Sequence, residues 1–149
     1  MDQRKRLDQL IAHFDLSPLR EKPRKGWLKA VRESLGISAQ QLAKRMKLKN
    51  HASILAFEKR EKEKAITLKA MEDMAGAMDC HFIYAVVPSG SSFEKLIDER
   101  AKKIAEQMIQ KVAHSMKLEN QSITQDQQAQ QIIELAKELK EKLDHRLWD

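Results

Sequence analysis

Cysteine, glycine, proline and aromatic residues are all scarce in this chain of 149 residues. The single cysteine, Cys80, excludes an internal disulfide. Four glycines, three prolines and 5% aromatic residues occur beside abundant Lys, Gln, Glu, Ala, Leu and Met, a helix-forming composition. No apolar run approaches the roughly 18 residues of a membrane span, and no signal-peptide pattern is present. We therefore expect a cytoplasmic, mainly α-helical protein of about one domain.

The residues of catalytic and metal sites are also scarce. The five histidines lie far apart, and no His-x-x-x-His or Cys-x-x-Cys spacing is present to hold a metal ion. The chain has no glycine-rich phosphate loop and no serine in a nucleophile elbow. Cys80 lies beside His81 in a segment that is typical of a core. We expect no enzyme activity, no cofactor and no metal.

Positive charge, in contrast, is concentrated in one part of the chain. Lys and Arg number 28 against 22 Asp and Glu, which gives a net charge of +6. Residues 26–66 carry 10 basic and 4 acidic side chains, whereas residues 92–149 carry 10 and 11. A basic block followed by a charge-balanced helical half suggests that one part binds a polyanion and the other binds protein. The alternative is that lysine-rich helices are simply well solvated.

Apolar spacing predicts two helices in the first 36 residues. Residues 2–16 place apolar side chains at i, i+3, i+4 and i+7, and Ser17-Pro18 should end this helix. After a polar stretch, a second helix is expected over residues 26–36, where Gly36 stops it.

Three further helices are predicted before residue 80. The pattern Ser38-Ala-Gln-Gln41 is a capping box that starts one of them. Another begins at about Asn50, and the charged residues 58–64 after it suggest a loop or a frayed helix end. Thr67 should cap the third.

The apolar pattern changes after residue 80. Residues 81–88 form a short apolar, β-prone run closed by Pro88, which predicts the only strand of the chain. Since no second strand is visible, we expect this segment to pair with its copy across a two-fold axis, or to pack as an extended segment on the helices. A homodimer is therefore expected, also because helix-turn-helix proteins usually read two half-sites.

The remainder predicts a helical hairpin. A long helix is expected from Ser92 to about Leu118, and a last helix over residues 124–147, each with one apolar face. The predicted domains are an N-terminal helix and linker (1–25), a helix-turn-helix domain (26–80), a short strand and linker (81–91) and a C-terminal helical region (92–149). The expected fold class is mainly α: a phage-repressor-like helix-turn-helix bundle, one short strand and a C-terminal helical hairpin.

A helix, a short turn and a second helix occupy residues 38–57, inside the most basic segment. This arrangement resembles the helix-turn-helix of phage-repressor (xenobiotic-response-element type) regulators. In such motifs a small residue, here Ala43, lets the two helices cross closely, and the second helix lies in the major groove. The turn departs from the pattern, because Lys47 stands where glycine is common and the turn is one residue longer.

The resemblance suggests which side chains would contact double-stranded DNA. Base contacts are expected from residues that lie near the start of the second helix and are not needed for the core: Lys49, Asn50, His51 and Ser53. Lysine can donate to guanine, and asparagine can pair with adenine. Phosphate contacts are expected from polar and basic residues of both helices: Gln40, Gln41, Lys44, Arg45, Lys59 and Arg60. The alternative for each residue is an ordinary solvated side chain.

A wider likeness covers roughly residues 20–125. It rests on these segments: Arg24-Lys-Gly-Trp-Leu-Lys-Ala-Val-Arg32, Leu35-Gly36, Ala65-Ile-Thr-Leu-Lys69, Ala77-Met-Asp-Cys80, Tyr84-Ala-Val-Val-Pro88 and His114-Ser-Met-Lys-Leu-Glu-Asn-Gln121. Together they resemble the family called mobile mystery protein A. Proteins of that family are encoded beside a Fic-domain partner, mobile mystery protein B. The resemblance implies an antitoxin-like role in addition to DNA binding.

One short motif gives this role a mechanism. The segment Ser115-Met-Lys-Leu-Glu119-Asn120 fits the Fic inhibitory pattern, which is Ser or Thr, three residues, Glu, then Gly or Asn. In Fic proteins this glutamate pairs with an arginine that otherwise binds the ATP γ-phosphate. AMP transfer to a target hydroxyl is then blocked. A bidentate, charge-assisted pair would hold the guanidinium away from the triphosphate.

Helical geometry leaves two alternatives for this motif. At 100° per residue, Glu119 falls about 20° and Ser115 about 60° from Val112, so both are expected to continue the apolar face of the long helix. Alternatively, the helix ends near Leu118 with Asn120 as its cap and leaves Glu119 exposed.

Three functions therefore compete at the level of sequence. The first is a DNA-binding regulator that is also the antitoxin of a Fic-type AMP transferase. The second is a plain homodimeric repressor whose C-terminal helices only dimerise or bind an effector. The third is a helical adaptor without a DNA function, which the basic block argues against.

Overall fold

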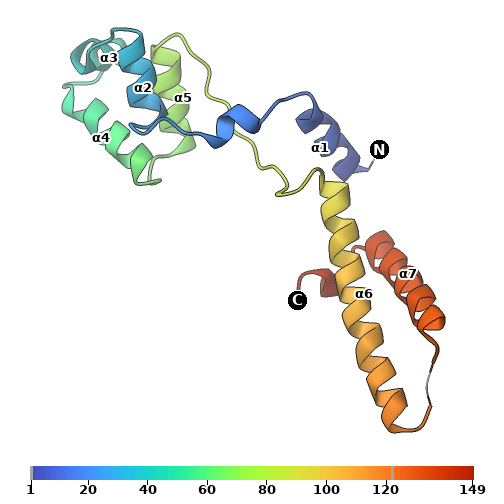
Figure 1. The fold of residues 1–149 in the computed structure, drawn as a ribbon. Coiled ribbons are helices and arrows are strands. Elements are labelled where there is room, and N and C mark those ends of the chain that lie inside the picture. The colour runs from blue at the N-terminus through green and yellow to red at the C-terminus, as the bar shows by residue number, and fades with distance from the viewer. Residues whose placement is uncertain (1, 122) are drawn as a thin grey trace. The chain divides into compact units, whose positions relative to one another are not determined.

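The computed structural model describes residues 2–121 and 123–149, which fold into seven α-helices with no strand in these ranges (Figure 1). The chain divides into two compact units. The central unit is Asp15–Ala85, and the terminal unit combines the residues up to Phe14 with Val86–Asp149. None of the described helices is both long and apolar enough to cross a membrane.

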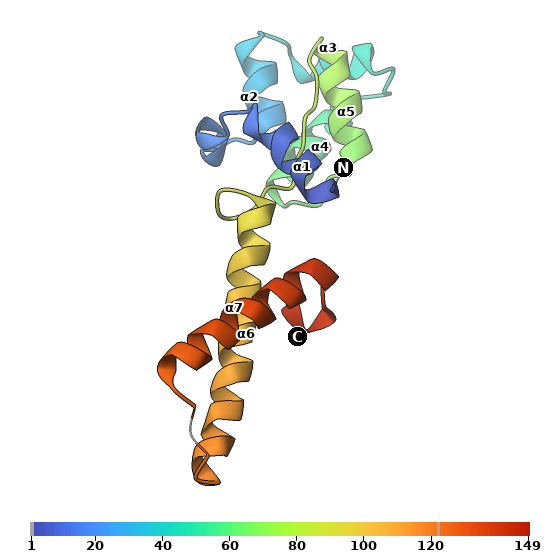
Figure 2. The ribbon, with the colours of Figure 1, turned by 90° about the vertical axis from the view of Figure 1, so that its right-hand side faces the viewer.

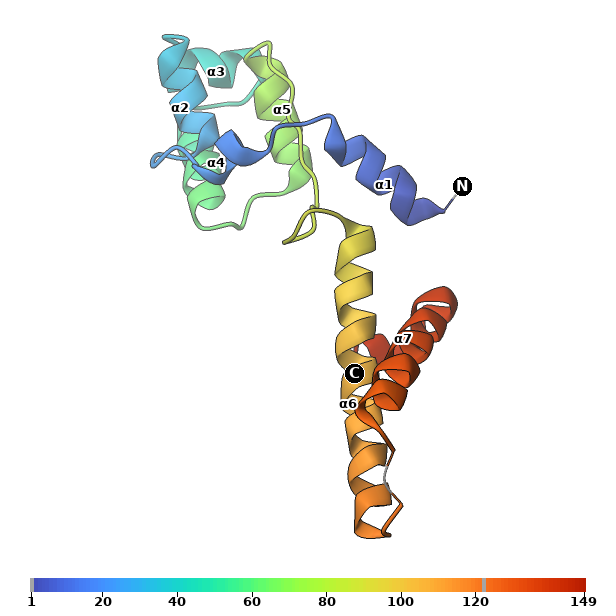
Figure 3. The ribbon, with the colours of Figure 1, turned by 45° about the vertical axis from the view of Figure 1, so that its right-hand side comes forward.

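Four α-helices build the central unit around one core (Figure 3). They are α2 (Trp27–Ser34), α3 (Ala39–Arg45), α4 (Ala52–Lys62) and α5 (Leu68–Ala77), preceded by the 3₁₀ helix η1 (Ser17–Arg20). The buried core residues come from all four helices and from the end of α5: Leu28, Leu42, Ala43, Ile54, Met74 and Met78. The four helices match the predicted positions within a few residues.

The prediction of a loop or a frayed helix end at residues 58–64 is wrong for residues 58–62, because α4 continues to Lys62. Glu58 is buried and forms a bidentate pair with Arg32 of α2, with Nε to Oε1 at 2.6 Å and Nη2 to Oε2 at 3.2 Å. Arg32 also donates to the carbonyl of Ile37 at 3.0 Å. The hydrogen bond that Arg32 donates to the Glu58 carboxylate raises the pKa of Arg32 above its ordinary value. The charged run is helical because its first carboxylate has a partner 26 residues earlier in the chain.

Helices α2 to α7 all end in the same way, although the chain has only four glycines. After each helix one residue takes the left-handed conformation, and the next amide donates to a carbonyl five residues back. Only α2 uses glycine at the left-handed position; the five other helices use Lys47, Lys64, Asp79, Asn120 and Leu143. A side chain in this conformation costs about 1 kcal/mol, so the short connections are made at some cost in stability.

The terminal unit contains α1 (Gln3–Ala12), α6 (Phe93–Leu118), α7 (Gln125–Lys142) and the 3₁₀ helix η2 (His145–Leu147). Helix α7 crosses α6 and packs against it, which confirms the predicted pair of C-terminal helices (Figure 2). Their core is small and consists of Ala101, Ala105, Leu139 and Leu147, with four partly buried neighbours. The alanines let the two helices approach closely.

Helix α1 is joined to α6 by a cap that the sequence pattern does not reveal. The Asp8 carboxylate accepts hydrogen bonds from the amides of Phe93 and Glu94, at 2.7 and 3.1 Å. These amides open α6 and have no partner within the helix. Lys140 of α7 adds ion pairs to Glu94 and Asp98, both at 2.6 Å. The three helices of the terminal unit are thus tied together at one end of α6.

The predicted strand at residues 81–88 is wrong. The segment is not helical, and its backbone forms no hydrogen bond within the described residues. A strand requires a paired neighbour, which a single copy of the chain does not supply here. Phe82 and Tyr84 stack with ring centroids 5.7 Å apart, while Ile83 and Val86 are 80% and 84% exposed.

Candidate DNA-binding surface and inhibitory motif

Helices α3 and α4 are positioned by local sequence signals. The Ser38 hydroxyl accepts from the Gln41 amide at 3.1 Å, and Gln41 Oε1 accepts from the Ser38 amide at 2.8 Å, which confirms the predicted capping box. Ala43 is 3% exposed and packs in the core between the helices. Lys47, where glycine was expected, adopts a φ of 57°, and the Leu48 amide then closes the turn on the Ala43 carbonyl at 2.8 Å.

The four residues predicted to contact bases all lie at the beginning of α4. Lys49, Asn50 and His51 precede the helix, and Ser53 belongs to its first turn. The first three are exposed and Ser53 is half-buried. Within the part of the chain that the structure describes, none of the four side chains forms a hydrogen bond or an ion pair. These side chains therefore remain available to a ligand.

The six residues predicted to contact phosphates divide into two groups. Gln40, Lys44 and Arg60 are exposed and have no ion pair or side-chain hydrogen bond among the described residues. The other three have internal contacts: Gln41 closes the capping box, Arg45 donates to the Ala77 carbonyl at 2.5 Å and to Asp79 at 2.7 Å, and Lys59 pairs with Glu63 at 3.8 Å. The exposed group is freer to meet a phosphate.

Charge is divided unequally between the two units. The central unit contains 15 basic and 9 acidic side chains, whereas the terminal unit contains 13 of each. The entire net charge of +6 therefore belongs to the central unit. Such a distribution favours attraction of a polyanion to the central unit only.

The predicted inhibitory motif lies at the C-terminal end of α6. Helix α6 ends at Leu118, Glu119 is its C-cap, and Asn120 has a φ of 58°. The Ser115 hydroxyl donates to the Lys111 carbonyl at 3.2 Å within the helix. All three motif residues are exposed, and the carboxylate of Glu119 has no partner within residues 2–121 and 123–149.

The expectation that Ser115 and Glu119 continue a buried apolar face is wrong, because this face is itself exposed at the end of α6: Ser115 is helical and exposed, and so is Val112. The alternative, a helix that ends near Leu118 and leaves Glu119 exposed, is the observed one; Glu119 is the C-cap, and Asn120 follows it in the left-handed conformation. Val112 and Leu118 near the motif are also exposed, by 52% and 75%. Figure 1 shows that the last turns of α6 extend beyond the start of α7, so this end of the helix is not covered by its neighbour.

Sequence analysis missed two contacts that shape the central unit. Arg45 connects α3 to the end of α5, and Glu61 caps α2 through the amides of Trp27 and Leu28, at 2.7 and 2.9 Å. Both partners lie more than 30 residues apart in the chain, so no local spacing reveals them. In the described parts of the chain, no three His, Cys, Asp or Glu side chains gather as a metal site would require.

Comparisons of the chain with protein-family models, curated proteins and solved structures found no match. A function must therefore be inferred from the residues themselves and from their geometry. Two features are distinctive: the unpaired polar side chains beside α4, and the exposed Glu119 at the end of α6.

Proposed function

We propose that the chain is a DNA-binding transcriptional regulator that also acts as the antitoxin of a Fic-domain AMP transferase encoded nearby. DNA binding is assigned to the central unit, through a helix-turn-helix formed by α3 and α4. Inhibition is assigned to the end of α6. The observation that carries the proposal is Glu119, which fits the inhibitory pattern and holds an unpaired carboxylate on an exposed helix end.

The DNA-binding part is supported by charge and by the free side chains. The central unit carries the whole net charge of +6, which suits a duplex because its backbone is a polyanion. The exposed Lys49 and Asn50 lie before the first turn of α4, the part of a recognition helix that reaches base edges. Gln40, Lys44 and Arg60 would hold phosphates and fix the register.

The inhibitory part follows from the chemistry of a carboxylate at a helix end. A negative charge is poorly placed at the C-terminus of a helix, because the helix dipole is negative there. Pairing with a guanidinium of the partner would relieve this repulsion and form two charge-assisted hydrogen bonds. The arginine would then no longer orient the ATP γ-phosphate, and AMP transfer would stop for lack of positioning. The exposed Val112 and Leu118 would add apolar contact around the motif.

A homodimer is part of the proposal. Residues 81–88 form a non-helical, mostly exposed apolar segment whose backbone has no partner among the described residues. Packing of this segment against its copy would cover Ile83 and Val86. Sedimentation should show a dimer at micromolar concentration, and Ile83→Lys with Val86→Lys should shift it to monomer. A wild-type monomer at that concentration contradicts this part.

The alternative is a plain homodimeric repressor whose C-terminal helices only dimerise or bind an effector. One observation favours it: Asn120 gives α6 the same left-handed ending as α2 to α5 and α7, so the motif also has an ordinary structural explanation. The two proposals differ in what the Glu119 side chain does. Only the antitoxin requires its carboxylate.

DNA binding is tested by titrating a labelled duplex from the region upstream of the gene at several salt concentrations. With about six phosphate contacts, the affinity should fall roughly a thousandfold between 50 and 200 mM salt. Lys44→Gln and Arg60→Gln should each reduce the salt slope by about one. Lys69→Gln is the matched control, because Lys69 pairs with Asp73 on the surface of α5. Binding that does not respond to salt contradicts DNA recognition.

Inhibition is tested by the affinity of the Fic-domain partner for a non-hydrolysable ATP analogue. The wild-type chain should weaken this affinity, whereas Glu119→Gln should do so about 10- to 100-fold less, because it lacks the charge-assisted pair. Glu99→Gln serves as the control, since Glu99 is another exposed carboxylate of α6. Equal effects of the wild type and Glu119→Gln leave the plain repressor.

A further inference from the structure

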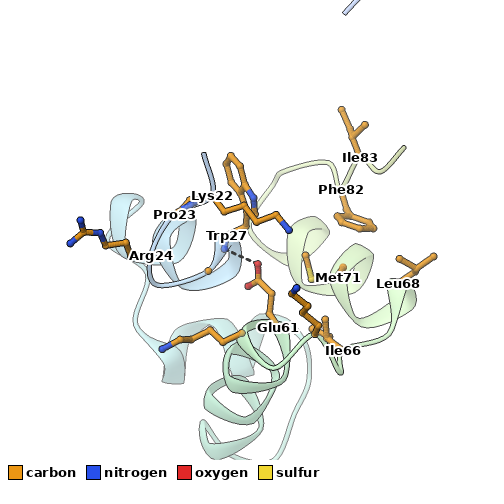
Figure 4. Close-up of a pocket in the computed structure, with 13 residues that line it drawn as sticks. Lys22, Pro23, Arg24, Trp27, Glu61, Ile66, Leu68, Met71, Phe82 and Ile83 are labelled. Atoms are coloured by element: carbon orange, nitrogen blue, oxygen red, sulfur yellow. Dashed lines mark hydrogen bonds between the residues drawn. The ribbon is translucent and has the colours of Figure 1, made fainter. Parts of the chain in front are cut away.

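A cavity of about 480 Å³ that is partly open to solvent lies at the surface of the central unit, apart from the beginning of α4. It is bordered by the first turn of α2, the end of α4, the beginning of α5 and the residues after α5. Figure 4 shows Trp27 and Lys22 on one side of the cavity, Met71 and Phe82 on the other, and Glu61 between them. The volume falls in the range of sites for small molecules, roughly 300–1,000 Å³.

The wall of the cavity is apolar and contains two aromatic rings. Its apolar side chains are Trp27, Ile66, Leu68, Met71, Phe82 and Ile83. Trp27 and Leu68 remain 41% and 51% exposed, so the core of the unit does not bury them fully. An aromatic ligand could bury these surfaces and stack against the rings, which prefer offset or edge-to-face contacts.

The rim of the cavity is cationic. Lys22, Arg24, Lys62 and Lys64 border it, and none of them forms an ion pair with another described residue. Figure 4 shows the Arg24 side chain directed away from the cavity, so the lysines dominate the rim. The one carboxylate at the cavity is Glu61, and its two oxygens already accept the Trp27 and Leu28 amides at 2.7 and 2.9 Å.

We propose that this cavity binds a small aromatic carboxylate. The ring would lie between Trp27 and Phe82, and the carboxylate would meet the ammonium groups of the rim. Charge complementarity selects an anion over a neutral molecule or a cation, because the rim has unpaired lysines and the only acid is occupied by amides. This inference does not depend on DNA binding or on Fic inhibition.

The probe is 2-naphthoate, and its uncharged and cationic analogues, 2-naphthamide and 2-naphthylmethylammonium, are the matched comparisons. The chain has two tryptophans, Trp27 in the central unit and Trp148 in the terminal unit, so their indole N–H signals report each unit separately. Trp148→Phe assigns the two signals. For a ligand of this size we expect a dissociation constant on the order of 1 mM.

The expected result is a saturable shift of the Trp27 signal by 2-naphthoate, with the Trp148 signal unchanged. The amide should bind about tenfold more weakly, and the cation more weakly still. Lys22→Gln with Lys62→Gln should lower the naphthoate affinity several-fold, whereas Lys69→Gln, outside the cavity, should not. The lysine variants alter exposed rim residues of the central unit, so their folding can be checked by the position of the ligand-free Trp27 signal.

Three results would overturn the proposal. One is no shift of the Trp27 signal at 10 mM naphthoate. Another is equal binding of the anion, the amide and the cation, which would indicate unspecific contact with apolar surface. The third is equal weakening by Lys69→Gln and by the rim variants, which would indicate a general charge effect.

Discussion

The two units of the molecule achieve stability in different ways. The central unit buries large side chains from four helices, including Leu42, Ile54 and Met74, and adds the buried Arg32–Glu58 pair. The terminal unit is slightly longer, yet its core is built from two alanines, Leu139 and Leu147. Both units leave large apolar side chains exposed, such as Leu55 and Leu68 on the central unit and Phe14 and Val112 on the terminal unit, so the difference lies in their cores.

This difference is what the two proposed roles require. A DNA reader needs a rigid platform, because base contacts depend on an accurately placed helix. A unit with a small core has less stability of its own, so a bound partner can contribute more to it. The central unit should therefore unfold as a stable body, and the terminal unit should gain stability on binding its partner.

The largest expected effect is the loss of stability of the central unit when the buried carboxylate of Glu58 is removed. Glu58→Ala leaves the guanidinium of Arg32 buried without a partner, which should lower the free energy of unfolding by about 3–5 kcal/mol. Urea denaturation followed by Trp27 fluorescence in a Trp148→Phe background measures this. Glu63→Ala, which removes an exposed carboxylate of the same run, should cost less than about 1 kcal/mol. If both variants lowered the free energy of unfolding by similar amounts, the predicted contribution of the buried Arg32–Glu58 pair would be contradicted.

The cap from Asp8 tests whether α1 belongs to the terminal unit. Asp8→Ala removes the acceptor of two amides at the start of α6, which should cost about 1–2 kcal/mol and loosen α1. Hydrogen exchange at Phe93 and Glu94 should accelerate, with no change in the central unit. Asp8→Asn should recover the protection only in part, since its one side-chain oxygen replaces two carboxylate oxygens that each accept from one amide. Unchanged exchange in Asp8→Ala would show that the cap is dispensable.

A change in the opposite direction is expected at the turn between α3 and α4. Lys47→Gly should stabilise the central unit by up to about 1 kcal/mol, because glycine adopts a positive φ without strain. Lys44→Gly, inside the exposed face of α3, should destabilise it by a similar amount. Thermal denaturation of both variants provides the measurement. Destabilisation by Lys47→Gly would contradict the left-handed ending of α3.

The smallest expected effect is a loss of stability of the terminal unit at acidic pH, through Asp144 near its C-terminal end. Hydrogen bonds from the Arg146 side chain and amide hold the pKa of Asp144 well below its usual range. Because the folded pKa lies below the unfolded value of about 3.9, this contribution is complete above that pH and is lost as the pH falls further. The terminal unit should therefore weaken below about pH 4, and Asp144→Asn should flatten that decline. A decline of equal slope in Asp144→Asn would contradict the assignment.

Local signals in the sequence predict most of this fold. Capping patterns at Ser38 and Thr67 and the apolar spacing of the helices are confirmed, because these features act over one or two turns. The wrong predictions involve partners far along the chain: Glu58 is helical because of Arg32, and residues 81–88 have strand composition without a strand partner. At Ser115 and Glu119 the angular spacing does not show that this end of the apolar face of α6 is exposed.

The most direct test of the central claim is AMP transfer by the neighbouring Fic-domain protein, measured with ATP and its target, with and without this chain. The account predicts that the wild type and Glu99→Gln suppress transfer, and that Glu119→Gly does not. Equal transfer with no addition, with the wild type and with Glu119→Gly would contradict the antitoxin function. Suppression by all three forms of the chain would contradict the role of the Glu119 carboxylate.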